Sequence, residues 1–308
     1  MWRAAVVFVV LAVVGCGEAP AGAPASPTTA TAATMAAAPS TTSAPDPPAA
    51  PATTTTVPPT SSTAGPAATT TTTVPSTDAP AGPEPRNPEP EPELRAVTPE
   101  SPLRVWVIGD SLAGPLGEGL RVIVPEPVRI TIDHVGGTGL ARPDLFDWPD
   151  VIAERLPEVA PDAVVFHVGA NDAQGMPIPG GWAEFGTPEW IEHYRSVVGS
   201  VMDQITDRTE RLYWVGAPIM SGANTSAAMV VINRAFESEA TLRERVVYVD
   251  AFAVFQDGAG EYAEELPGPD GVLVAVRQPD GVHYTGAGAV HLARHVWGTI
   301  APEWGLEA

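Results

Sequence analysis

Residues 103–114 read Leu-Arg-Val-Trp-Val-Ile-Gly-Asp-Ser-Leu-Ala-Gly, and the other predicted elements are arranged around this segment. Its apolar, β-branched run suits a strand covered on both faces, and the Gly-Asp-Ser break suits a turn into a helix. In an open α/β sheet, ligands bind at such carboxyl-end turns. The stretch therefore predicts a hydroxyl, that of Ser111, at the end of a buried strand. On its own, Asp110 or Ser111 could equally be a cap for the next helix.

Downstream, strand-like runs alternate with segments of helical period, which predicts a parallel sheet with helices on both faces. The predicted strands are 103–108, 128–135, 163–168, 211–216 and 246–249. The predicted helices are 112–122, 149–156, 188–208, 225–243 and 285–300. Residues 99–308 are thus expected to form one three-layer α/β domain.

Two segments interrupt this alternation. Residues 173–186, rich in Pro and Gly, are predicted to be a long loop after the third strand, and residues 256–279 a second connection with a short hairpin around 272–276. Long loops in compact domains usually carry function, so both are candidates for ligand binding. The alternative is that they only cover the edges of the sheet.

The N-terminus resembles a bacterial export signal. Arg3 is followed by an apolar run at 4–15, which is too short to span a membrane because a spanning helix needs roughly 20 residues. The only cysteine, Cys16, comes after a small residue at the end of this run, as in a bacterial lipobox. We predict that residues 1–16 form a lipoprotein-type signal, that Cys16 carries the lipid, and that the domain lies outside the cytoplasm. An ordinary signal peptide cut nearby is the alternative.

Residues 17–98 are nearly all Ala, Pro, Thr, Ser and Gly, and they turn acidic towards residue 93. Such a segment has too little large apolar surface to offset the entropy of ordering it. We predict a disordered stalk that carries the domain away from the membrane. A stalk of about 80 residues could extend over roughly 250 Å.

The formal net charge of the 308-residue chain is −21, and its 16 basic residues are all arginine. Binding to nucleic acid or to anionic lipid requires a basic patch. We therefore expect no nucleic-acid partner and contact with a membrane only through the N-terminal lipid. An acidic exported domain suits neutral or cationic material, and we expect it to be a monomer.

Two later motifs supply partners for the Ser111 hydroxyl. Asp280 lies three residues before His283, so its carboxylate can accept from one imidazole nitrogen and leave the other facing a serine. Asn171 comes after the third strand and places an amide at the same edge of the sheet, where it could stabilise a developing oxyanion. Each motif alone has a simpler interpretation, as the first turn of a helix or as a turn-forming Asn-Asp pair.

Four motifs resemble, in order and at fitting intervals, the sequence blocks of the SGNH/GDSL hydrolase superfamily. They are Gly109-Asp110-Ser111-Leu112, a glycine turn after the second strand, Gly169-Ala170-Asn171-Asp172 and Asp280-x-x-His283. Residues 139–149 and 189–195 further resemble a bacterial branch, the DUF459 group. The resemblance implies a flavodoxin-like sheet, a serine esterase mechanism, and neither metal nor cofactor. It also implies Ser111 as nucleophile, His283 as base and Asp280 as the residue that orients the base.

The same resemblance implies an oxyanion hole made by the backbone N–H of Ser111, a glycine N–H and the Asn171 side chain. Several glycines compete for the second place, since Thr138-Gly139 stands where the superfamily has Ser-Gly. We predict Gly139, with Gly137 as the alternative.

Three further residues are candidates for substrate binding. Arg142 could bind a substrate carboxylate or a sugar oxygen, or it could pair with Asp144 or Asp147. Trp148 and Trp182 could form a wall for stacking sugars, although Trp148 could instead belong to the core.

These observations predict an exported serine esterase that hydrolyses O-acyl esters, acetyl above all, of a cell-envelope glycan. An O-acyltransferase to a sugar hydroxyl and a lipase or lysophospholipase are the alternatives, and a non-catalytic glycan-binding module is a third. His291 and His295 have a zinc-like spacing, but neither a Glu directly after His291 nor a third ligand is evident, so no metal site is predicted.

Overall fold

The computed structural model describes residues 94–307. The predicted signal, Cys16 and residues 17–93 of the predicted stalk lie outside them. Residues 94–98, which we assigned to the stalk, pack on the domain: Val97 lies against the core, and Arg95 Nε donates to Asp162 Oδ1 over 3.1 Å. The folded region therefore begins before residue 99, through a long-range ion pair that composition does not reveal.

Five parallel strands form the central sheet, in the order β2-β1-β3-β6-β7. They are β1 (Leu103–Gly109), β2 (Val128–His134), β3 (Ala163–His167), β6 (Arg211–Val215) and β7 (Val246–Val249). Each lies within one residue of its predicted bounds. The order is that of a flavodoxin-like sheet, so the predicted fold class is confirmed.

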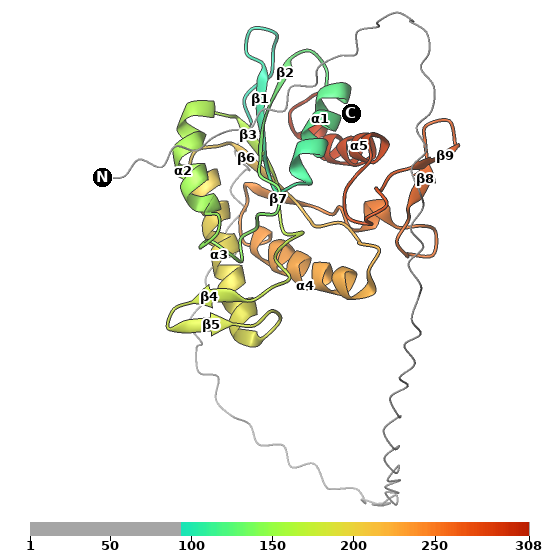
Figure 1. Ribbon diagram of the computed structural model, residues 1–308. Coiled ribbons are helices and arrows are strands. Elements are labelled where there is room, and N and C mark those ends of the chain that lie inside the picture. The colour runs from blue at the N-terminus through green and yellow to red at the C-terminus, as the bar shows by residue number, and fades with distance from the viewer. Residues whose placement is uncertain (1–93, 308) are drawn as a thin grey trace, which may run out of the picture. The chain divides into compact units, whose positions relative to one another are not determined.

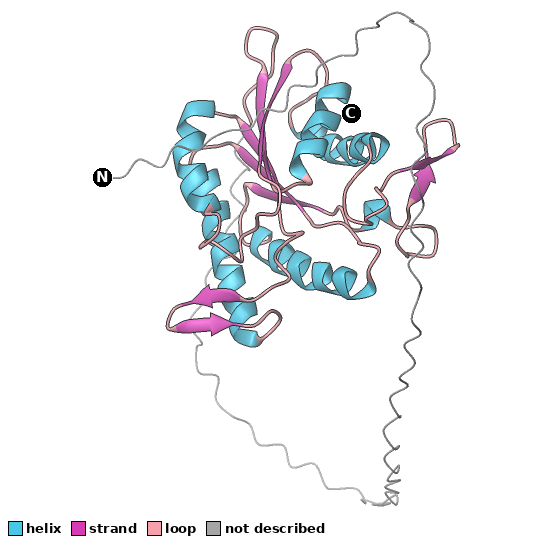
Figure 2. Cartoon of the chain, in the orientation of Figure 1, coloured by secondary structure: helices cyan, strands magenta, loops and turns pink. Residues whose placement is uncertain are grey.

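Helices cover both faces of the sheet, as Figures 1 and 2 show. Helices α1 (Ala113–Ile123) and α5 (Gly286–Glu303) pack together on one face. On the other face lie α2 (Trp148–Val159), α3 (Pro188–Thr206) and α4 (Ala223–Ala240), with α3 in contact with both its neighbours. Side-chain caps begin three of them: Asp147 accepts from Asp150 N, Thr187 from Trp190 N and Thr285 from Gly288 N.

The inner strands are buried on both faces, which explains their continuous apolar sequence. Every residue of β3 and β6 is buried, whereas in the edge strand β2 only Val128 is buried and the other residues are half-buried or exposed. Aromatic rings on the α2–α4 face contact one another edge-on or tilted, from Trp148 through Phe166 and Trp214 to Phe236. This core holds the carboxyl ends of the strands in fixed positions.

Both interrupting segments contain short hairpins. Residues 173–186, which we predicted to be a loop, hold β4 (Met176–Ile178) paired with β5 (Gly181–Ala183), next to α3 in Figure 1. That prediction was incomplete, because strands of three residues are too short to show an alternating pattern. The hairpin expected around 272–276 is present as β8 (Glu265–Pro267) and β9 (Leu273–Ala275), after a 3₁₀ turn, η1 (Ala253–Phe255). Within residues 94–307, no helix is both long and apolar enough to cross a membrane.

Candidate active site

Ser111 follows Asp110 in the turn after the end of β1, at the carboxyl edge of the sheet. Its turn depends on Gly109, which has a φ of 143°, and whose added Cβ would lie 1.8 Å from the His167 carbonyl oxygen. Only glycine fits here, where Gly109 of β1 lies beside His167 of the parallel neighbour β3. Helix α1 has no side-chain cap, so the Ser111 hydroxyl does not cap it. The hydroxyl instead lies 2.9 Å from His283 Nε2.

The three predicted catalytic side chains form one hydrogen-bonded chain. His283 Nδ1 lies 2.8 Å from Asp280 Oδ2, and His283 Nε2 faces Ser111. Because a carboxylate only accepts, the ring proton belongs on Nδ1, and Nε2 is left to accept from the serine hydroxyl. The structure thus brings together residues that are 172 positions apart in the chain.

Asp280 is held in its ionised form by its surroundings. Hydrogen bonds from the His283 ring and from the backbone N–H groups of His283 and Val282 lower the pKa of Asp280 to about 2. Its side chain is nevertheless 46 % exposed, and that of His283 is 38 % exposed. The pair therefore lies at an open surface, where a large substrate can reach it.

Asn171 lies close to the glycine loop between β2 and α2. Its Nδ2 donates to the Thr138 carbonyl oxygen over 2.9 Å, which occupies one of its two amide protons. The glycines of that loop have different neighbours. A Cβ added to Gly136 would lie 3.6 Å from Ser111 Cβ, whereas one added to Gly139 would lie 2.0 Å from Asp172 Oδ1. Gly136, which we did not single out, is therefore the glycine of this loop whose added Cβ would have Ser111 as its neighbour.

Two buried carboxylates tie the loops of the site together. Asp110 accepts from Leu112 N at 2.9 Å and from Ala170 N at 3.2 Å, so it joins the Ser111 turn to the Asn171 turn. Burial raises the pKa of Asp110 to about 7; these N–H groups oppose the shift and the Asp172 charge adds to it.

Asp172 in turn joins the Asn171 turn to the glycine loop and to α3. It accepts from Leu140 N at 3.0 Å, from Ala141 N at 2.9 Å and from the Tyr194 hydroxyl at 2.6 Å. Burial raises its pKa as well. Gly139 has no room for a side chain because this carboxylate occupies the space.

The three proposed substrate-binding residues have different surroundings. Arg142 forms a two-point ion pair with Asp144, at 2.7 and 2.6 Å, and its guanidinium lies 5.4 Å from the centre of the Trp182 ring. Trp182 is 49 % exposed and covers Gly175. Trp148 is 1 % exposed and donates to Thr138 Oγ1, so its ring belongs to the core, which was the other role considered for it, and the proposed stacking role for Trp148 is wrong.

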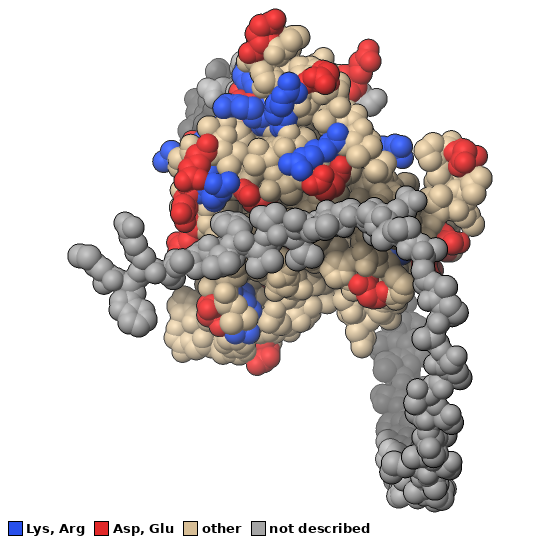
Figure 3. Space-filling model, turned by 45° about the horizontal axis from the view of Figure 1, so that its top comes forward, with Lys and Arg blue, Asp and Glu red and all other residues tan. Residues whose placement is uncertain are grey.

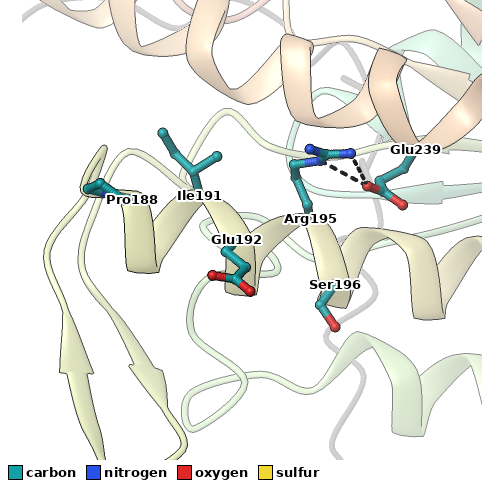
Figure 4. Close-up of a pocket in the computed structure, with 6 residues that line it drawn as sticks. All are labelled: Pro188, Ile191, Glu192, Arg195, Ser196 and Glu239. Carbon is teal, nitrogen blue, oxygen red and sulfur yellow. Dashed lines mark hydrogen bonds and ion pairs between the residues drawn. The ribbon is translucent and has the colours of Figure 1, made fainter.

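A surface pocket of about 500 Å³ lies between α3 and α4, away from these residues. Figure 4 shows that Arg195 in this pocket reaches across to Glu239 on α4, an ion pair of 2.9 Å. On the face shown in Figure 3, arginines lie beside acidic residues and do not form a continuous basic area. Among residues 94–307, no cluster of three or more His, Cys, Asp or Glu side chains could hold a metal ion.

Similarity to solved structures is confined to the overall fold. A lipase/acylhydrolase from Enterococcus faecalis is 14 % identical, with 67 % of this chain and 97 % of that chain covered and a TM-score of 0.47. An acetylxylan esterase from Geobacillus stearothermophilus, a catalytic mutant of Axe2, is 18 % identical, with 67 % and 95 % covered and a TM-score of 0.44. LAE5, an α/β hydrolase from the metagenome of Lake Arreo, Spain, is 15 % identical, with 70 % and 100 % covered and a TM-score of 0.49. Similarity this low carries no conclusion about activity.

None of the curated proteins matches the chain in sequence. The model of one protein family does match it, over residues 104–299, which is more than half of the chain and almost all of the folded domain. Its description is "protein of unknown function (DUF459)". The predicted resemblance to this group is thereby confirmed, and the chain belongs to the DUF459 family.

Proposed function

We propose that this protein is a serine esterase of the SGNH/GDSL type. The observation that carries the proposal is the hydrogen-bonded chain from Ser111 Oγ to His283 Nε2, at 2.9 Å, and from His283 Nδ1 to Asp280 Oδ2, at 2.8 Å. Nucleophile, base and orienting carboxylate are already within hydrogen-bonding distance, which is the geometry that acyl transfer by a serine needs.

These contacts define the chemistry. His283 Nε2 removes the hydroxyl proton as Ser111 Oγ attacks the acyl carbon, and the Asp280 carboxylate stabilises the imidazolium that forms. His283 then gives the proton to the leaving alcohol oxygen as the ester C–O bond breaks. Water attacks the acyl-enzyme, His283 takes its proton and returns it to Ser111, and the carboxylic acid is released.

The oxyanion of each tetrahedral intermediate needs hydrogen-bond donors beside Ser111. The second amide proton of Asn171 and the backbone N–H of Ser111 are proposed as two of them. The third donor stays a prediction: we named Gly139, with Gly137 as alternative. The Cβ position of Gly136, 3.6 Å from Ser111 Cβ, supports a donor from the beginning of the loop, where Gly137 also lies.

We propose O-acyl esters of a cell-envelope glycan, acetyl esters above all, as the substrate. Three observations support a polymeric and largely uncharged substrate: the exposure of Asp280 and His283, the half-exposed Trp182 ring beside Arg142, and the acidic composition. Indole rings stack on the apolar faces of sugars, and arginine donates to sugar oxygens. Access of water to the site favours hydrolysis over transfer to a sugar hydroxyl.

Export and lipid anchoring are part of the proposal and rest on the sequence of residues 1–16. If Cys16 carries the lipid, the protein should enter the detergent phase in a detergent phase-separation experiment, and the Cys16→Ser variant should enter the aqueous phase. Aqueous partitioning of the unchanged protein would contradict this part alone.

The function is tested with the full chain on p-nitrophenyl esters of increasing acyl length, and then by acetate release from purified cell wall. We expect the highest kcat/KM for acetyl, release of acetate, and a loss of about 10⁴-fold or more in Ser111→Ala. Ester hydrolysis that persists in the Ser111→Ala variant would contradict the mechanism. A preference for long acyl chains would favour the lipase alternative, and acetyl transfer to an added glycan the transferase.

A further inference from the structure

Beneath the Asp280–His283 loop lies a buried arginine that neither the motifs nor the mechanism above involves. Arg277 is 1 % exposed. Among residues 94–307, the Nε and Nη1 atoms of Arg277 have no hydrogen-bond partner. No carboxylate of these residues forms an ion pair with Arg277. A buried cation without a counter-charge is costly, so its presence calls for an explanation in what it contacts.

Aromatic faces surround the Arg277 guanidinium. Its central carbon lies 5.0 Å from the ring centres of Phe255 and Tyr284 and 5.7 Å from that of Tyr262. These rings come from separate parts of the long connection between β7 and α5, and the negative face of an aromatic ring attracts a cation. Three aromatic residues of this connection therefore contact the same guanidinium.

A backbone contact of Arg277 leads directly to the catalytic carboxylate. Its Nη2 donates to the Gly281 carbonyl oxygen over 3.3 Å, and Ser221 N donates to the same oxygen over 3.2 Å. That carbonyl belongs to the Gly281–Val282 peptide, whose N–H donates to Asp280 Oδ1 over 2.9 Å. One planar peptide unit therefore connects the guanidinium to Asp280.

Because the peptide is planar, fixing its carbonyl fixes the direction of its N–H. The positively charged guanidinium that donates to this carbonyl also polarises the peptide and strengthens the hydrogen bond that the Val282 N–H donates. Ser221 packs closely against Gly281, whose φ is 69° and whose added Cβ would lie 1.8 Å from Ser221 Oγ, so only glycine fits at this position.

His283 is held from its other side. Tyr284, the next residue, stacks on Phe255 and lies against the guanidinium, and its hydroxyl is 3.0 Å from His167 Nε2 at the end of β3. His167 is buried and is itself 3.2 Å from the Val215 carbonyl oxygen of β6. The backbone on each side of the His283 ring is thus linked to the sheet or to Arg277.

We propose that Arg277 is a positioning residue, which holds Asp280 and His283 in line with Ser111 through the Gly281–Val282 peptide and Tyr284. This inference rests on the proposed function for its kinetic consequences. Its structural part, the ordering of residues 278–285, does not depend on what the protein catalyses.

The test compares Arg277→Met and Arg277→Lys with Arg211→Met in the full chain. Arg211 is a matched control because it is also buried. It is the first residue of β6, so it lies at the amino ends of the strands, away from the site at their carboxyl ends, and it pairs with Glu303 at 3.1 Å. We measure amide hydrogen exchange of residues 278–285, the thermal midpoint, and kcat and KM on an acetyl ester.

We expect Arg277→Met to accelerate exchange in residues 278–285 and to lower kcat about 10²-fold with little change in KM, as a small displacement of catalytic groups does. Arg277→Lys keeps the charge but not the planar fork, so it should recover part of kcat. Arg211→Met should lower the thermal midpoint while leaving kcat and the exchange of residues 278–285 unchanged.

Wild-type kcat or wild-type exchange in a folded Arg277 variant would overturn the proposal, as would an equal loss of kcat in Arg211→Met. If Arg277→Met does not fold, Arg277→Lys decides by the same criteria. If the unaltered protein hydrolyses no ester, the proposed function fails by itself, and the exchange measurement still decides whether Arg277 orders the loop.

Discussion

At the scale of single residues, Asp280 differs from a second aspartate in a similar turn by its contacts with His283. The tetrapeptide Pro-Asp-Gly-Val occurs twice, at 269–272 and 279–282. In both copies the aspartate accepts from the valine N–H, at 3.1 Å for Asp270 and 2.9 Å for Asp280, and the glycine has a positive φ. Only Asp280 also accepts from a histidine ring. The same tetrapeptide therefore forms a turn in both places, and only Asp280 has the histidine contact on which its proposed catalytic role rests.

Asp280→Asn should lower kcat by about 10²- to 10⁴-fold with little change in KM, because an amide does not hold the proton on Nδ1 of His283 or stabilise the imidazolium. Steady-state kinetics on an acetyl ester measure the effect. Asp270→Asn is the control for loss of a turn carboxylate, and its kcat should equal that of the unaltered protein. Equal effects of the two substitutions would contradict the role of Asp280.

The sequence alone could identify Ser111, Asn171, Asp280 and His283 as candidates, because each comes after a strand or before a helix at the same edge of the sheet. It could not choose among Gly136, Gly137 and Gly139, because adjacent glycines differ only in their neighbours. It could not place Trp148 in the core or show that Arg277 is buried, since both depend on contacts between distant segments.

At the scale of elements, the close approach of the parallel strands β1 and β3 at their carboxyl ends depends on Gly109. Gly109→Ala should lower the free energy of unfolding by about 3 kcal/mol, because its Cβ would meet the His167 carbonyl at 1.8 Å and its φ is 143°. Urea denaturation measures the change. Gly298→Ala, on α5 with nothing within 4 Å of the added Cβ, should instead stabilise the protein by up to about 1 kcal/mol. Similar effects at both sites would contradict the close approach of the two strands.

The five strands of the central sheet were predictable because buried parallel strands are apolar over most of their length, as in β3 and β6, where His167 ends one and Arg211 begins the other. Hairpin β4–β5 was not. Its strands read Met-Pro-Ile and Gly-Trp-Ala, and Pro and Gly both count against a strand. Packing of Trp182 over Gly175 and the pairing of the two strands form this hairpin, and neither is a property of the local sequence.

At the scale of the whole molecule, Asp162 joins segments at the amino edge of the sheet. It accepts from Arg104 N at 2.8 Å, from the Arg104 side chain at 2.9 Å and from Arg95, which precedes β1. Burial alone would raise its pKa, but the hydrogen bonds from Arg104 and Arg95 outweigh burial and lower the pKa of Asp162 to about 2.

A carboxylate whose pKa is lowered on folding stabilises the protein above its unfolded pKa of about 4, and this contribution is lost as the pH falls through about 2. Asp162→Asn should therefore lower the free energy of unfolding at pH 7 by about 2 kcal/mol, with the difference from the unaltered protein narrowing as the pH falls below 4. Urea denaturation at several pH values measures it. A difference that does not depend on pH would contradict the ion-pair explanation.

The claim that Ser111 is a nucleophile activated by His283 is tested most directly by labelling with a fluorophosphonate, which reacts with activated serines whatever the natural substrate. Peptide mass spectrometry of the full chain should find one phosphonate per protein, on Ser111. Labelling should be absent in Ser111→Ala and slowed by orders of magnitude in His283→Ala. An unlabelled Ser111 in the folded, unaltered protein, or equally fast labelling in His283→Ala, would contradict the claim.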